Sequence, residues 1–377
     1  MKLSTLIPVV LSGATCIQAA VFPVPDTPYR VKWTSSELVD HSRADPFNAS
    51  HPRRVMISRF TPIRKRDCVK SCRVPYMNNF MASVEDAILD GFFGEGIWPG
   101  GLLATLEMEV CCKVRGGRHQ NFPTLLFDTG LNTTRLLYSG TAQRFASIGY
   151  EVIVMDHPYE TDAVQFPDGT VIYGGRVPRD PNATDALQFA LDVRSADASF
   201  VLDRLGIRKP RKVGYVGDSF GGPAAANALL HDSSIAAGVN IDGAMFGRAL
   251  DLGVASPFLI FGSTGHNSSS DESWSRFLNA TAAQHPSTWI KELSLANSMH
   301  GYLTDFPQIG DVAGLRDNQQ LVDLVLGEIT GARTLEILTE YLSDFFSMAL
   351  DGKPEGLLAG PSKLYPEVAF VWPNRFM

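Results

Sequence analysis

The sequence has no excess of basic residues. Its 377 residues include 33 Lys and Arg against 40 Asp and Glu, so the formal net charge is −7 at pH 7. Binding to nucleic acid or to anionic lipid by electrostatics needs a basic surface. The acidic balance therefore argues against nucleic acid as a partner and against charge-driven docking on membranes. Internal repeats and low-complexity tracts are also missing. With 45% hydrophobic and 19% charged residues, the chain can form a full-sized globular core.

The sequence also lacks a long hydrophobic run. A membrane-spanning helix needs about 20 apolar residues, and no segment approaches that length. The short apolar run 3–11 follows Lys2 and precedes the small residues Ala19 and Ala20, a pattern typical of a secretory signal peptide over residues 1–20. We therefore expect a secreted protein with no integral membrane association. Its mature part, residues 21–377, is expected to form one domain.

Cysteine is scarce. Of the five cysteines, one lies in the predicted signal peptide, which leaves Cys68, Cys72, Cys111 and Cys112. An even number in a secreted protein favours two disulfides. Adjacent cysteines rarely bridge each other, so we expect Cys111 and Cys112 to pair with the first two, in either order. A zinc site is disfavoured because no histidine cluster accompanies the cysteines. We expect neither a metal nor another cofactor.

Five Asn-x-Ser/Thr sequons fit the secretory route and are glycosylation candidates. They are Asn48, Asn132, Asn182, Asn267 and Asn279.

Strand-like and helix-like segments alternate through most of the chain. Two strands, 29–36 and 53–61, are expected to form an antiparallel opening, followed by an irregular insertion over 63–101 and a strand over 103–113. Beyond residue 123 the expected strands are 124–128, 150–156, 237–242, 257–261 and 289–294, and the expected helices are 136–148, 184–205, 274–283 and 332–350. This alternation predicts an α/β fold with a mostly parallel sheet.

The most informative segment lies at residues 211–222. A short apolar strand leads into Gly217-Asp218-Ser219-Phe220-Gly221, and an alanine-rich helix follows over 223–230. This order is typical of a nucleophile elbow, in which a strained turn exposes a serine hydroxyl and small residues on both sides make room for it. The dipole of the following helix would stabilise developing negative charge. An ordinary glycine turn is the alternative, and the strand–turn–helix context favours an ester or amide hydrolase.

A nucleophilic serine needs a histidine base and an acid that orients it. On this fold their order along the chain is Ser, acid, His. That order removes five of the eight histidines: His41, His51, His119, His157 and His231. Of the remaining three, His300 follows the strand 289–294 directly and is favoured, His266 is second, and His285 precedes a proline at a helix end and is interpreted as a surface residue.

The favoured acid is Asp242. It ends the strand after the elbow and is followed by a glycine that permits a turn, so its carboxylate can reach an imidazole at the same edge of the sheet. Asp251 and Asp271 are alternatives in loops, where plain solvation would explain them.

Three segments, 217–222, 240–246 and 298–306, resemble the catalytic blocks of the platelet-activating factor acetylhydrolase family. The 23-residue gap from Ser219 to Asp242 matches that family, the segment 127–139 is similar to its oxyanion loop, and the helix with Arg194 and Asp197 is similar to the one before its elbow. The resemblance spans residues 54–306. It implies the α/β-hydrolase fold and calcium-independent cleavage of short or oxidised acyl groups from the sn-2 position of phospholipids.

The resemblance also implies roles for the site residues. Ser219 would be the nucleophile, His300 the general base and Asp242 the acid that holds it, with the backbone N–H groups of Phe220 and Leu131 as the oxyanion hole. A glycan on Asn132, beside Leu131, would obstruct such a pocket. Met245 and Phe246 follow the acid and are weak candidates for an acyl pocket, with core packing as the alternative. The glycine- and proline-rich loop 158–181 is a candidate lid.

Two positions depart from the family pattern. Asp218 stands where the family usually has histidine, and Asp128-Thr129-Gly130 stands where it usually has Ser-His-Gly. A carboxylate at 218 would raise the pKa of His300, so we expect activity to need a more alkaline pH.

The sequence therefore favours a secreted serine esterase that acts on a small ester or a phospholipid and touches lipid surfaces transiently at most. A cutinase-like esterase or polyester hydrolase for other esters is one alternative. A hydrolase-fold protein that binds without turnover is another.

Overall fold

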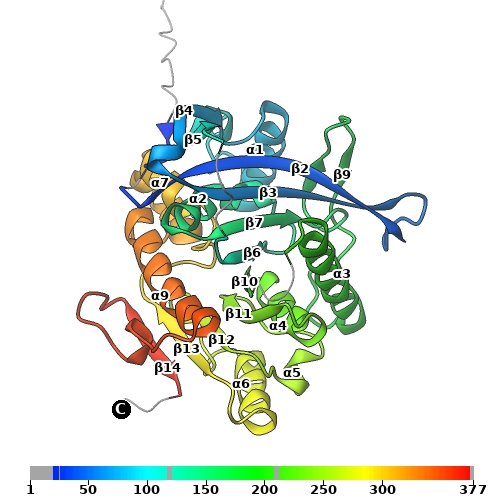
Figure 1. Ribbon diagram of the computed structural model, residues 1–377, viewed down its shortest axis with the longest axis vertical. Helices are drawn as coiled ribbons and strands as arrows, with labels where there is room; N and C mark the ends of the chain where they lie inside the picture. The colour runs from blue at the N-terminus through cyan, green and yellow to red at the C-terminus, as the bar shows by residue number, and fades with distance from the viewer. Residues whose placement is uncertain (1–19, 25, 117–120, 208–211, 374–377) are drawn as a thin grey trace, which may run out of the picture.

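The computed structural model describes residues 20–24, 26–116, 121–207 and 212–373 (Figure 1). The predicted signal peptide, apart from Ala20, and His119 lie outside these ranges, so the signal peptide stays a prediction.

A large mixed sheet forms the centre of the described chain. Its nine strands lie in the order β14-β13-β12-β11-β10-β6-β7-β3-β2. The six strands from β7 to β13 are parallel to one another, whereas β2, β3 and β14 pair antiparallel with their neighbours. The strands are β2 Tyr29–Ala44, β3 Pro52–Arg64, β6 Thr124–Asp128, β7 Glu151–Asp156, β10 Val213–Asp218, β11 Ile235–Ile241, β12 Phe258–Gly262, β13 Ile290–Leu295 and β14 Val368–Trp372.

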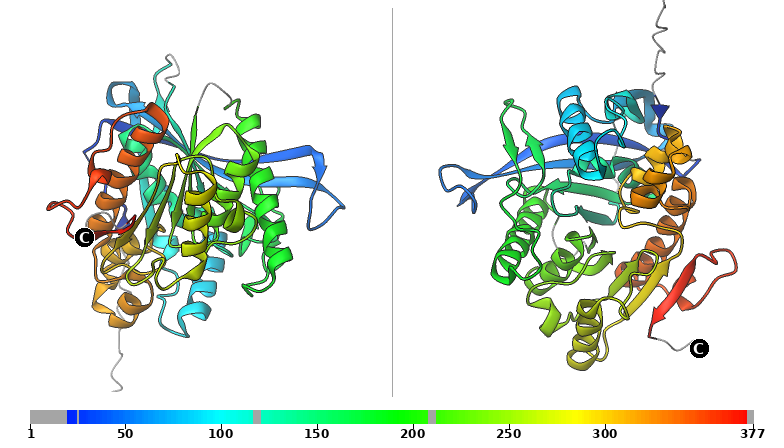
Figure 2. Two further views of the ribbon diagram at one scale, coloured as in Figure 1. Left: turned by 90° about the horizontal axis from the view of Figure 1, so that it is seen from below. Right: turned by 180° about the vertical axis from the view of Figure 1, so that it is seen from behind.

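Helices cover both faces of this sheet (Figures 1 and 2). Because side chains alternate along a strand, neighbouring residues of β6 belong to different cores: Leu125 and Phe127 pack on one face and Leu126 on the other. The first face is covered by α2 Ser139–Ile148, α7 Phe306–Val312 and α9 Gly331–Asp351, and the second by α3 Thr184–Arg204, α4 Gly221–His231, α5 Ala249–Leu252 and α6 Glu272–Gln284. This arrangement is the α/β-hydrolase fold that the sequence predicted.

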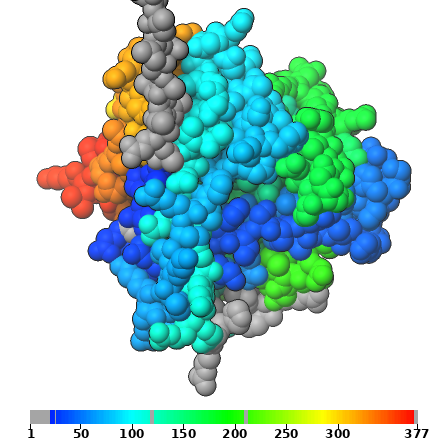
Figure 3. Space-filling model, turned by 90° about the horizontal axis from the view of Figure 1, so that it is seen from above, coloured from blue at the N-terminus to red at the C-terminus, as the bar shows by residue number. Residues whose placement is uncertain are grey.

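The N-terminal insertion carries the cysteines. It forms a small sheet in the order β1-β5-β4, made of β1 Ala20–Val21, β4 Cys68–Pro75 and β5 Leu106–Val114, and a helix, α1 Asn79–Phe93. Cys68 bonds to Cys111 and Cys72 to Cys112, with Cα atoms 5.8 and 5.9 Å apart. The predicted disulfides between the two cysteine pairs are therefore confirmed. They staple β4 to β5. Figure 3 shows this insertion, in light blue and cyan, on the outer surface of the molecule.

Several elements differ from the expected pattern. The ribbon of β2 and β3 runs past the sheet edge and is much longer than predicted, because polar residues continue to pair where hydrophobic alternation has stopped. The predicted loop 158–181 holds a hairpin, β8 Ala163–Gln165 with β9 Val171–Tyr173. The proline-spaced tail supplies β14, and short helical turns fill the region after α7: α8 Gln319–Leu321 and the π-helical turn Val322–Leu326.

Further short turns lie at Lys65–Asp67, Leu103–Thr105, Arg135–Tyr138, Leu315–Asp317 and Leu357–Ala359. Among the helices of the described residues, none combines the length and the apolar character that crossing a membrane requires.

Candidate active site

The elbow at the end of β10 is strained, as a nucleophile elbow must be. Ser219 has φ 51°, a left-handed conformation that is uncommon for a residue with a side chain. The turn is possible because its neighbours are glycines: a Cβ on Gly217 would lie 1.8 Å from the carbonyl oxygen of Gly221, and one on Gly221 would lie 2.5 Å from that of Asp128. The turn leaves the Ser219 side chain partly exposed at the carboxyl edge of the sheet.

Ser219, His300 and Asp242 form one hydrogen-bonded row. The Nε2 of His300 lies 3.0 Å from the Ser219 hydroxyl oxygen, and its Nδ1 lies 2.7 Å from Asp242 Oδ2. Asp242 is buried and follows β11, whereas the His300 side chain is 61% exposed in the loop after β13. The hydrogen bond to Asp242 raises the pKa of His300; burial opposes this rise and the charge of Asp218 adds to it.

His266, the second choice for the base, reaches the same acid from the other side. Its Nδ1 lies 2.9 Å from Asp242 Oδ1, and its Nε2 lies 2.9 Å from Asp271 Oδ2. It makes no contact with the serine hydroxyl in the described structure. Of the remaining candidates, Asp251 pairs with Arg276 at the surface, and His285 is partly exposed beside the carbonyl of Leu252.

The candidate oxyanion donors are available. No hydrogen bond within the described ranges engages the backbone N–H of Leu131 or that of Phe220. Both residues belong to one apolar cluster, which also contains Phe246. Phe220 stands at the N-cap of α4, so its N–H lies where the helix dipole is positive.

A buried ionic network holds the candidate oxyanion loop. Arg194 donates to the carbonyl of Thr129 at 2.6 Å and to Asp128 at 2.9 Å, and it is also paired with Glu160. His157 donates toward the same Asp128 at 2.9 Å. Burial alone would raise the pKa of Asp128, but the charges of Arg194 and His157 hold it below its ordinary value. This network holds the backbone of the segment Asp128-Thr129-Gly130.

Asp218 is only partly satisfied by hydrogen bonds. Its side chain is buried, its Oδ2 accepts a hydrogen bond from Tyr138 at 2.8 Å, and its Oδ1 has no hydrogen-bond partner within the described residues. Burial raises its pKa to about 7, although the charge of His300 and the Tyr138 hydroxyl oppose the rise. The same hydroxyl accepts the N–H of Gly130 at 2.9 Å. Tyr138, near the end of the segment 127–139 that resembles the oxyanion loop, thus joins Asp218 of the elbow to Gly130, a link that the sequence did not reveal.

The two pocket candidates lie in different surroundings. Met245 is fully buried in the core cluster below the sheet, together with Trp274. Phe246 is partly exposed and packs on Phe220, with ring centroids 6.1 Å apart. Of the two, Phe246 is therefore the one beside the candidate oxyanion hole.

The sequons differ in exposure. Asn48, Asn182 and Asn279 are exposed, and Asn267 is half-buried. Asn132 is tied down, because its amide donates to the carbonyl of Glu160 at 2.8 Å and accepts from Arg179 at 2.9 Å. These contacts disfavour a glycan on Asn132.

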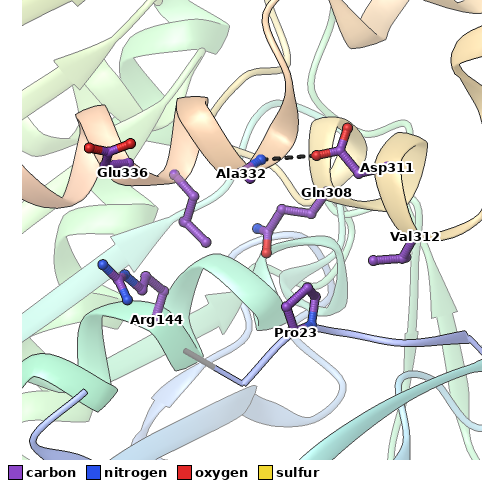
Figure 4. Close-up of a pocket in the computed structure, with 8 residues that line it drawn as sticks. Pro23, Arg144, Gln308, Asp311, Val312, Ala332 and Glu336 are labelled. Carbon is purple, nitrogen blue, oxygen red and sulfur yellow. Dashed lines mark hydrogen bonds between the residues drawn. The ribbon is translucent and has the colours of Figure 1, made fainter. Parts of the chain in front are cut away.

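A separate cavity of about 200 Å³ lies away from these residues, between α2, α7 and α9 (Figure 4). It is lined by Pro23, Arg144, Gln308, Asp311, Val312, Ala332, Leu335 and Glu336. None of these residues belongs to the candidate site. Among the described residues, no group of three or more His, Cys, Asp or Glu side chains is arranged to hold a metal ion.

Comparison with known proteins identifies the family. The chain is 41% identical over 366 residues to a protein of Arthroderma benhamiae named "Probable 1-alkyl-2-acetylglycerophosphocholine esterase", and the match covers 93% of this chain and 94% of that protein. The chain belongs to the platelet-activating factor acetylhydrolase-like family of carboxylic ester hydrolases. No family model matches this member.

A solved structure supports the same class. The structure of a ferulic acid esterase from Streptomyces cinnamoneus superposes on this esterase with a TM-score of 0.75 and 25% sequence identity, covering 93% of this chain and 99% of that one. Both comparisons lead to ester hydrolysis, and they differ in the ester that the named protein cleaves.

Proposed function

We propose that this esterase is a secreted serine hydrolase that cleaves short acyl groups from the sn-2 position of phosphocholine lipids. The observation that carries the proposal is the row Ser219–His300–Asp242, with hydrogen-bond distances of 3.0 and 2.7 Å at the strained elbow. The name of the Arthroderma relative supports the substrate. The two disulfides and the sequons support secretion and glycosylation at Asn48, Asn182, Asn267 or Asn279.

The proposed mechanism has two halves. Ser219 Oγ attacks the ester carbonyl while His300 Nε2 takes the hydroxyl proton, and Asp242 stabilises the imidazolium that forms. The N–H groups of Leu131 and Phe220 hold the oxyanion. His300 then gives its proton to the departing alcohol oxygen, which leaves an acyl-serine. Water, deprotonated by the same histidine, releases the carboxylic acid and restores the serine.

The apolar surroundings of the serine offer a candidate wall for the acyl group. The candidate acyl wall consists of Phe246, Phe220 and Leu131, which belong to one packed cluster with Phe47 and Leu187. Each further methylene of an acyl chain needs apolar space, so the extent of this cluster would set the acyl length that the site accepts. The hairpin of β8 and β9 lies within the loop 158–181 expected to form a lid, but its residues Ala163 and Val164 are fully buried, so the lid stays a prediction.

A second candidate function is supported by the ferulic acid esterase neighbour. A site that cleaves aromatic or polymeric esters would use the same three residues with a different pocket, so the catalytic row does not separate the two functions. Binding without turnover is a third possibility, which would need Ser219 to be unreactive.

A substrate series tests the proposal. Phosphocholine lipids whose sn-2 acyl chains range from about 2 to about 16 carbons would be compared with methyl ferulate, because each added methylene changes apolar burial by a fixed step. Ser219→Ala is the control. The expected result is a kcat/KM for the acetyl lipid at least about tenfold above that for the longest chain, a difference of about 1.4 kcal/mol. A preference for methyl ferulate would favour the second function. If the protein turned over none of these esters, the proposal that it is an enzyme would be refuted.

A further inference from the structure

His266 has a geometry that the proposed mechanism does not use. Its two ring nitrogens each lie 2.9 Å from a carboxylate oxygen, Nδ1 from Asp242 and Nε2 from Asp271. A carboxylate only accepts hydrogen bonds, and a neutral imidazole has a single N–H. Only the doubly protonated ring can donate to both. Because the pKa values of Asp242 and Asp271 are both lowered, both acids are ionised acceptors, and this geometry indicates a cationic ring between them.

The surroundings hold this ring rigidly. Asp271 is the N-cap of α6, where its other oxygen accepts the N–H of Ser273 at 2.8 Å. The ring of Trp274 lies against His266, with centroids 4.2 Å apart, and the Trp274 indole N–H donates to the carbonyl of Gly243 at 2.7 Å. The loop that carries His266 is thus tied both to the helix behind it and to the turn that presents Asp242.

Asp242 consequently receives three N–H donors. The backbone N–H of Ser263 and Nδ1 of His266 point to Oδ1 at 2.5 and 2.9 Å, and His300 points to Oδ2. With Oδ1 saturated in this way, the carboxylate cannot rotate away from His300. The backbone of Asp242 has a φ of 58°, which is strained for aspartate. These hydrogen bonds therefore also help to hold Asp242 in this conformation.

We propose that His266 is a positioning residue of this esterase, a fixed imidazolium between Asp242 and Asp271 that holds the Asp242 carboxylate toward His300. The inference rests on the proposed function, since it assigns His300 as the base. This role explains the presence of His266 and Asp271, which lie in the loop between β12 and α6 and do not contact Ser219.

The charges around both histidines fix the direction of the pH effect. His300 faces Asp242, Asp218 and the His266 cation, and His266 faces Asp242, Asp271 and the buried Glu292. Burial alone would lower the pKa of His266, but its bonds to Asp242 and Asp271 raise it to about 9. The His266 cation in turn lowers the pKa of His300. Removing that cation should therefore shift the acidic limb of the pH–rate curve to higher pH.

Three variants and the unmodified chain test the proposal. In His266→Phe, which keeps a ring against Trp274, we expect kcat for the acetyl lipid to fall roughly 10- to 100-fold, the loss typical of one hydrogen bond to a charged group. KM should change little, and the acidic limb of kcat/KM should move to higher pH. Asp271→Asn should move the acidic limb in the same direction by a smaller amount. The matched control, His285→Phe, removes a partly exposed histidine outside the candidate site and should leave kcat and the acidic limb unchanged.

A spectroscopic arm does not depend on activity. Nitrogen NMR of the unmodified protein at neutral pH should show both ring nitrogens of His266 protonated. A neutral His266 would overturn the proposal, and so would variants of His266 and Asp271 with an unchanged kcat and pH profile. If the unmodified protein hydrolyses no ester while His266 is still doubly protonated, the proposed function fails and the charged state of His266 stands.

Discussion

Replacing Asp218 by asparagine should stabilise the protein at neutral and alkaline pH. The pKa of this buried carboxyl is raised from its ordinary 3.8 to about 7. A carboxyl with a raised pKa in the native state binds more protons there than in the unfolded chain. The native state therefore loses stability as the pH rises from about 4 to about 7, and the loss is complete above that window.

The size of the effect follows from the pKa difference. At about 1.4 kcal/mol per pKa unit, the change from 3.8 to about 7 corresponds to a penalty of about 4 kcal/mol above neutral pH. In Asp218→Asn, the amide oxygen still accepts the Tyr138 hydroxyl, but an NH₂ group replaces an oxygen that has no partner in the described structure. That buried NH₂ group costs about 1 kcal/mol. The net gain is about 3 kcal/mol, or on the order of 4 °C in Tm for a chain of this length.

The assay is thermal unfolding of both proteins from about pH 4 to about pH 8, the window in which this carboxyl titrates, with Asp251→Asn as a matched control. Asp251 is an exposed carboxylate paired with Arg276, so its removal should change Tm little at any pH. The gain in Asp218→Asn should be absent at the acidic end and reach its full value at the alkaline end. A difference that does not depend on pH, or a variant that is less stable at the alkaline end, would refute the reasoning.

A second effect of Asp218→Asn and two further substitutions probe the site. Asp218→Asn should also move the acidic limb of kcat/KM to lower pH, because the charge of Asp218 raises the pKa of His300; pH–rate curves measure this. Tyr138→Phe leaves the N–H of Gly130 and the carboxylate of Asp218 without their shared partner, so kcat should fall about tenfold and the free energy of unfolding by about 1–3 kcal/mol. Gly243→Ala should abolish activity and folded yield, since its Cβ would lie 1.8 Å from the backbone oxygen of the serine.

Gly91→Ala is the control for the glycine substitution. Gly91→Ala lies in α1 with no atom within 4 Å of the added Cβ, so it should keep full activity and yield. An acidic limb that stays in place in Asp218→Asn would mean that His300 does not sense this carboxylate. A fully active Tyr138→Phe would mean that the oxyanion loop does not need its hydroxyl.

The parallel sheet and the elbow could be predicted because their signals are local. Each core strand is a short apolar run, and the glycines at 217 and 221 stand at fixed offsets from Ser219. Chain order and their positions after core strands predicted that Asp242 and His300 lie together, and the structure shows a hydrogen bond between them. The esterase family followed from the same blocks and agrees with the Arthroderma relative.

The parts that could not be predicted depend on contacts between distant residues. Tyr138 and Asp218 are 80 positions apart, and no local pattern links a phenol to a carboxylate across that distance. The sequence makes His266 a second candidate for the base, because its spacing does not reveal that it binds the second oxygen of Asp242. The pairing of β14 with β13 likewise depends on tertiary packing, since a tail interrupted by prolines gives a weak strand signal.

The central claim is that Ser219 is an activated nucleophile, and covalent labelling tests it most directly. A fluorophosphonate probe would be added to the folded protein and to Ser219→Ala, and the labelled peptide identified by mass spectrometry. The account predicts a single label on Ser219, slowed roughly 100-fold or more in His300→Ala because the base is gone. Folded protein that takes no label, or that is labelled at another residue, would contradict the account.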